Sequence, residues 1–150
     1  MRFIEICLDG WDQHVDIYDA QRLPARAGIL DKALATLIED LSQKGLLKTT
    51  LIALGTEFGR SPKINQNGGR DHHPGVFSGL FAGGGIKGGR TCGTSDKDAF
   101  SPDKAPVSIS DFNATIAHAM GLPLNQEIIS KSGRPFKVSN GGSPLTKLFT

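Results

Sequence analysis

Carboxylates and histidines gather in two turn-rich stretches of this 150-residue chain. The first follows an apolar N-terminal stretch and contains Asp12 and His14, and the second, residues 55–74, contains Glu57 and His72. Carboxylate oxygens combined with imidazole nitrogens suit zinc, manganese or iron, whereas carboxylates alone favour magnesium or calcium. These side chains would also suit a hydrogen-bonded polar turn, and their spacing alone leaves both interpretations open.

The spacing within each stretch adds two expectations. Asp12 and His14 are two positions apart, so on an extended chain both side chains leave the same side of the backbone and could approach one cluster. Arg60 and Arg70 belong to the second stretch, and a guanidinium group suits the recognition of an anionic group. We expect these arginines to face such a group. The alternative is a local ion pair on a turn, which at a protein surface contributes only about 0–1 kcal/mol.

The composition is that of an ordinary globular domain. Its length is sufficient for a hydrophobic core without disulfides. Seventeen basic and fifteen acidic side chains give a formal charge of +2, which is too weak to indicate nucleic acid or an anionic membrane as a partner. No apolar run is long enough to span a bilayer, and the N-terminus lacks the features of a signal peptide. We therefore expect one cytoplasmic domain over residues 1–150.

Apolar patterning predicts a strand, a helix and a second strand in the first third of the chain. Residues 2–8 are typical of a buried strand, and so are residues 49–54. Between them, Pro24 suits a first helical turn and Gly45 suits a helix end. The apolar stripe of this helix comprises Leu30, Leu34, Leu37, Ile38 and Leu41. This order of elements predicts a right-handed parallel crossover.

The remaining elements extend the same pattern. Residues 76–82 are typical of a third strand, Ser110 is expected to be the N-cap of a second helix that ends at Gly121, and residues 143–149 form a last helical turn. The sequence therefore predicts an α/β fold with a mainly parallel sheet flanked by helices. Both polar stretches would follow carboxyl ends of strands and meet at one edge of that sheet.

Six segments together form a specific combination of motifs: residues 10–14, 30–34, 55–62, 68–74, 82–89 and 110–122. In this combination the chain resembles the bacterial family called domain of unknown function 1501, and the likeness covers most of its length. That family is similar to the alkaline phosphatase and sulfatase superfamily. Members of the superfamily hold one or two metal ions at strand ends and hydrolyse phosphate or sulfate monoesters.

This resemblance implies an alkaline phosphatase-like domain with a divalent ion, zinc or another transition metal rather than magnesium or calcium. The implied ligands are Asp12, His14, Glu57 and His72, and the implied substrate is a small anionic ester. Relatives are longer and often carry a twin-arginine export signal to the periplasm. The resemblance thus implies the C-terminal portion of a longer domain, with the nucleophile elsewhere, and we expect a homo-oligomer to cover the open side. A non-catalytic remnant that binds metal, an anion or a partner chain is the alternative function.

Overall fold

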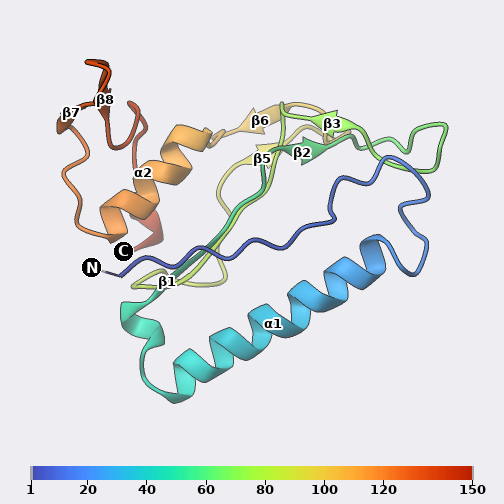
Figure 1. Ribbon diagram of the computed structural model, residues 1–150, viewed down its shortest axis with the longest axis horizontal. Helices are drawn as coiled ribbons and strands as arrows, with labels where there is room; N and C mark the ends of the chain where they lie inside the picture. The colour runs from blue at the N-terminus through green and yellow to red at the C-terminus, as the bar shows by residue number, and fades with distance from the viewer. Residues whose placement is uncertain (1, 150) are drawn as a thin grey trace.

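The computed structural model describes residues 2–149, and Figure 1 shows its two α-helices together with short strands and 3-10 helices. The helical elements are α1 (Leu23–Gln43), η1 (Leu47–Thr49), α2 (Ile109–Ala119) and η2 (Thr146–Leu148). The strands are β1 (Leu51–Leu54), β2 (Gly59–Arg60), β3 (His72–His73), β4 (Leu80–Gly83), β5 (Thr94–Ser95), β6 (Pro102–Lys104), β7 (Glu127–Ile129) and β8 (Pro135–Lys137).

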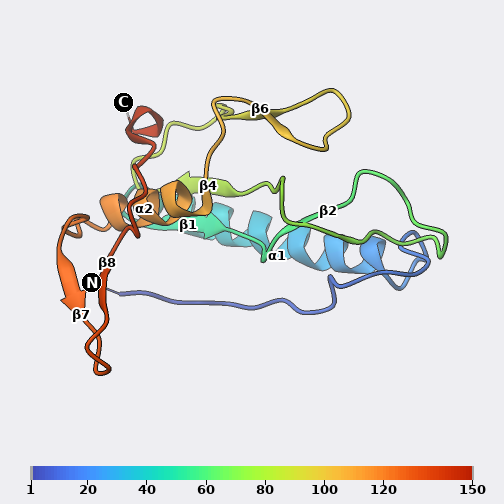
Figure 2. The ribbon, with the colours of Figure 1, turned by 90° about the horizontal axis from the view of Figure 1, so that it is seen from above.

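The strands form four separate antiparallel pairs, β1 with β4, β2 with β3, β5 with β6 and β7 with β8. The predicted α/β fold with a mainly parallel, alkaline phosphatase-like sheet is therefore wrong. Residues 2–8 belong to no strand, and Figure 2 shows them as an extended segment that runs apart from β1. Apolar content marks residues that gain from burial, but it does not specify which strand they pair with. The parallel crossover required residues 2–8 beside β1.

The long helix α1 confirms the predicted amphipathic helix between Pro24 and Gly45. Pro24 lies in its first turn, where a missing N–H costs no helical hydrogen bond. Gly45 follows the helix end with a φ of +69°, a conformation that glycine adopts without steric cost. None of the helix's residues is buried, and Leu37 is 40% exposed. The apolar stripe of α1 is therefore only partly shielded by the rest of the chain.

The core lies where α2 packs against the β1–β4 pair. Phe112 of α2 stacks on Phe81 of β4, with ring centroids 4.5 Å apart. The sequence predicted Ser110 as the N-cap of α2, but the N-cap is Ser108, which forms a capping box with Asp111. A serine stands at both positions, and only the acidic residue three places after Ser108 distinguishes them.

The C-terminal segment closes one side of this core. Thr115 of α2 is fully buried; its hydroxyl donates to the Asp111 carbonyl oxygen (2.7 Å) and accepts from the Leu145 backbone N–H (3.0 Å). The Asp111 carboxylate also binds this segment: its Oδ1 accepts from the Ser143 backbone N–H at 2.7 Å. Leu148 of η2, which follows these residues in the chain, is also buried. Polar anchoring thus holds residues 143–149 against α2.

The molecule exposes much more surface than an ordinary monomer. Its accessible area is 10635 Å², against about 7,400 Å² for a compact globular protein of its mass. The apolar side chains Phe3, Ile4 and Ile6 are 69%, 82% and 81% exposed. No helix within residues 2–149 is both long and apolar enough to cross a membrane.

Candidate metal centre

A small backbone ladder brings the two polar stretches together. The N–H groups of Asp16 and Ile17 donate to the carbonyl oxygens of Asn67 and Gly68, at 3.0 and 2.9 Å, and Arg70 N–H donates to the Gln13 carbonyl oxygen at 3.1 Å. Both views show these loops side by side near the start of α1 (Figures 1 and 2). We call these paired segments, residues 13–17 and 65–70, the loop ladder. It places His14 at the edge of the second polar stretch.

Glycine makes this close pairing possible. Gly69 is buried, and a Cβ atom there would overlap the backbone of His14 and Val15 at well under 3.0 Å. Gly68 forms the antiparallel bridge with Val15 and has a φ of +76°. The Gly68-Gly69 pair therefore allows two backbones to approach more closely than residues with side chains would permit.

The second structural support is the β2–β3 pair. Its register places Arg60 directly opposite His72. Side chains at opposed positions lie on the same face of an antiparallel pair, so both can reach one acceptor. That acceptor is Asp12: its Oδ1 lies 2.8 Å from Arg60 Nη2 and 2.8 Å from His72 Nε2.

Three side chains converge at the junction of these two supports, and we call Asp12, His14 and His72 the histidine–carboxylate cluster. One potential ligand atom from each lies within 4.8 Å of the other two. His14 Nε2 is 3.0 Å from Asp12 Oδ1 and 3.2 Å from His72 Nε2. The side chains of Asp12, His14 and His72 are 66%, 40% and 46% exposed, so an ion could enter from solvent.

The environment keeps the Asp12 carboxyl group ionised. The hydrogen bond from His72, followed by that from Arg60, holds the pKa of Asp12 well below its ordinary value. The pKa of Asp71 is also lowered, chiefly by the hydrogen bond from Asn65 and then by the contact with His14. Both carboxyl groups are therefore available as anions at neutral pH.

The remaining expected site residues lie outside the cluster or are paired within the chain. Glu57 is exposed on the loop after β1 and is not among the three clustered ligands of the described residues. Arg60 pairs with Asp12, and its Nη1 donates to the Arg70 carbonyl oxygen at 3.5 Å. Arg70 donates from Nη1 to the carbonyl oxygens of Ser61 and Pro62, both at 2.6 Å, and from Nη2 to Tyr18 at 3.3 Å. Both guanidinium groups thus brace the loops.

The contact of Phe58 with the cluster was not anticipated from the sequence. The Phe58 ring packs on His72 with centroids 4.3 Å apart, and it also lies 5.4 Å from the Arg60 guanidinium carbon. His73 faces away from the cluster: its Nε2 is 2.7 Å from the Phe100 carbonyl oxygen. The residues around Phe58 in the sequence do not indicate that it contacts His72, which lies fourteen positions later.

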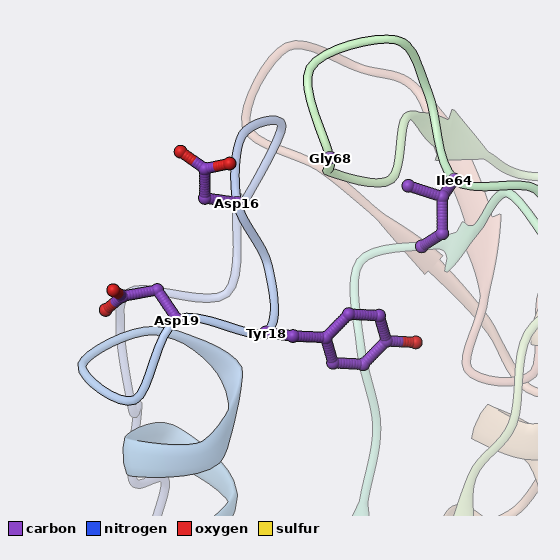
Figure 3. Close-up of a pocket in the computed structure, with 5 residues that line it drawn as sticks. All are labelled: Asp16, Tyr18, Asp19, Ile64 and Gly68. Atoms are coloured by element: carbon purple, nitrogen blue, oxygen red, sulfur yellow. The ribbon is translucent and has the colours of Figure 1, made fainter.

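Two open depressions flank these loops. Figure 3 shows the larger, about 550 Å³, in which the Tyr18 ring points toward Ile64 while Asp16 and Asp19 point away from it. The other, about 420 Å³, is lined in part by Phe58, Arg60 and Arg70. Because Phe58 and Arg60 also contact the cluster, this second depression is the one that adjoins it.

The donor set and its dimensions fit a transition metal ion. Tetrahedral zinc with bonds of about 2.0–2.1 Å separates its ligand atoms by about 3.3 Å. The three separations within the cluster are 2.8, 3.0 and 3.2 Å, so an ion would require the ligands to part by a few tenths of an ångström. Two imidazoles and one carboxylate leave a fourth position open, as in catalytic rather than structural zinc sites.

Fold and site together define a mixed helical and antiparallel protein with an exposed histidine–carboxylate cluster between two loops. In comparison with known proteins, residues 1–149 match the family described as Protein of unknown function (DUF1501). The chain belongs to this family, as its motifs indicated. No curated protein and no solved structure matches it.

Proposed function

We propose that this protein binds a divalent transition metal ion through Asp12, His14 and His72 and uses it to hydrolyse phosphate or sulfate monoesters. The observation that carries the proposal is the convergence of one carboxylate and two imidazoles from loops 58 residues apart. The type of reaction follows from the resemblance of the family's motifs to the alkaline phosphatase and sulfatase superfamily.

The chain's own groups would divide the work as follows. A bound ion would polarise the ester and lower the pKa of a coordinated water molecule. Asp12 contributes a negative charge to the site, and His14 and His72 contribute neutral nitrogen ligands. Phe58 limits the movement of His72 through ring contact. The depression beside Phe58 and Arg60 is the place where the substrate's organic group would lie.

A second function, a non-catalytic metal-binding module, is favoured by a different observation. Arg60 donates to Asp12 and to a backbone carbonyl oxygen, and Arg70 donates to two backbone carbonyl oxygens. An arginine held in this way would have to reorient before more than its remaining donors could reach a substrate anion. A module that only binds metal does not need that rearrangement.

Metal titration and ester hydrolysis separate these two functions. Zinc binding to the purified protein is measured by calorimetry, and turnover of an aryl phosphate and an aryl sulfate is measured with zinc, manganese or iron(II). We expect His72→Ala to abolish tight zinc binding and turnover, and His118→Ala to change neither, because the exposed His118 contacts the Phe149 ring away from the cluster. Zinc binding without turnover would favour the module, and wild-type protein that binds no metal would refute both.

A further inference from the structure

The strongest candidate outside the three ligands is the carboxylate on the far side of the His14 ring. His14 Nδ1 lies 3.1 Å from Asp71 Oδ1, while its Nε2 faces Asp12 and His72. A histidine that binds metal through Nε2 must carry its proton on Nδ1, and that proton needs an acceptor. Asp71 Oδ1 is placed to be that acceptor.

Asp71 is itself held by Asn65. Asn65 Nδ2 donates to Asp71 Oδ1 at 2.9 Å and to the His14 carbonyl oxygen at 3.1 Å. Its Oδ1 accepts from the backbone N–H groups of Asn67 and Gly69, both at 2.9 Å. Two N–H donors on the oxygen side and two oxygen acceptors on the nitrogen side fix the orientation of the amide. The carboxylate is thus oriented by the same loop that pairs with the backbone around His14.

We propose that Asp71, oriented by Asn65, is a positioning residue that keeps the proton of His14 on Nδ1 and so presents the Nε2 lone pair to a metal ion at the cluster. The inference rests on the proposed metal binding and adds a residue to it. Asp71 acts on the ion only through the imidazole ring. This role would explain why a carboxylate immediately precedes His72. The same short segment then carries one proposed ligand, His72, and the group that orients another, His14.

The role of Asp71 in metal binding is tested by zinc calorimetry. We expect Asp71→Ala to weaken zinc binding by about 10–100-fold, the usual effect of removing a partner behind a histidine ligand. Asp71→Asn retains an oxygen acceptor without charge and should lie between wild type and Asp71→Ala. The matched control is Asp16→Asn, since Asp16 is an exposed carboxylate two positions after His14 and only its backbone N–H belongs to the loop ladder. Its φ of +42° is tolerated by asparagine. Equal zinc affinity in Asp71→Ala and Asp16→Asn would overturn the proposal.

Nuclear magnetic resonance of the metal-free protein tests the tautomer directly. At alkaline pH, the ¹⁵N shifts of the two His14 ring nitrogens show which of them carries the proton. We expect the proton on Nδ1 in wild type and in Asp16→Asn, and a shift of the proton toward Nε2 in Asp71→Ala. A proton on Nε2 in wild type would refute the inference even if zinc binds. If wild type binds no metal, the proposed function fails, whereas the tautomer result still decides what Asp71 does to His14.

Discussion

Replacement of Gly69 by alanine tests whether the loop ladder assembles the cluster. Gly69 has a backbone conformation open to any residue, so the effect of the substitution would be steric rather than conformational. The added Cβ would overlap the carbonyl group of His14 and the amide nitrogen of Val15. Backbone atoms cannot rotate away as a side chain can, so the two segments must separate.

The cost follows from the contacts that such a separation breaks. Four hydrogen bonds join the segments: Asp16 to Asn67, Ile17 to Gly68, Arg70 to Gln13, and the Asn65 side chain to the His14 carbonyl oxygen. At about 0.5–1.5 kcal/mol each, their loss amounts to about 2–6 kcal/mol. Because Asp12 directly precedes the first segment, His14 belongs to it and His72 follows the second, the separations of 2.8 and 3.2 Å from His72 Nε2 to Asp12 Oδ1 and His14 Nε2 would also be lost.

The assay compares Gly69→Ala with Gly88→Ala, in which a Cβ would meet no atom within 4 Å. Urea unfolding and zinc calorimetry are measured on both variants and on wild type. We expect Gly69→Ala to unfold at lower urea concentration and to bind zinc at least tenfold more weakly, and Gly88→Ala to match wild type in both. Wild-type zinc affinity in Gly69→Ala would show that the ladder does not position His14.

Three further substitutions test the helices. Thr115→Val keeps the shape of a fully buried side chain but leaves the Leu145 N–H without its acceptor, so the free energy of unfolding should fall by about 1–3 kcal/mol, and thermal melting of Thr115→Ser should show a smaller loss. Asp111→Asn should cost about 0.5–2 kcal/mol at neutral pH, since it weakens the capping box of α2. Hydrogen bonds from Ser143 and Ser108 lower the pKa of Asp111 below 3.8, so its contribution is complete above that pH and is lost as the pH falls through the lower folded value. Urea midpoints of wild type and Asp111→Asn should therefore converge in acid, and a constant difference down to about pH 2 would contradict this assignment. Gly28→Ala should stabilise the protein by about 0.5–1 kcal/mol in thermal melts, because Gly28 lies inside α1 with open space around it, and a lower melting temperature would count against this.

The sequence predicted local elements well and their pairing poorly. The apolar stripe of α1 and the short apolar strand β1 are encoded by neighbours in the chain, and both are present. Which strand lies beside β1 depends on contacts far along the sequence, and the alternation of strand and helix suggested a parallel partner where the structure has β4 in antiparallel register. Residues 2–8 show the same limit, because their apolar side chains carry no information about the partner that would cover them.

For the candidate site, the sequence predicted which residues come together but not the structure that brings them together. Asp12, His14 and His72 do converge, but through the loop ladder and the β2–β3 pair rather than at the edge of a parallel sheet. Residue type indicated these candidate ligands, since three of the four histidines lie in these two stretches, each with a carboxylate nearby. The links from Asn65 to Asp71 and from Asp71 to His14 could not be foreseen, because they depend on the exact path of the second loop.

The loop ladder also has a consequence for how the chain folds. His14 and His72 are separated by 58 positions, and joining two points so far apart costs the unfolded chain about 3–4 kcal/mol of loop-closure entropy, apart from a constant term. An ion held between them would act as a removable cross-link, comparable to a disulfide that can be opened with a chelator. The stabilisation of the folded chain would grow with the logarithm of the free metal concentration, so the availability of the ion would set the fraction of molecules in which the two loops are joined.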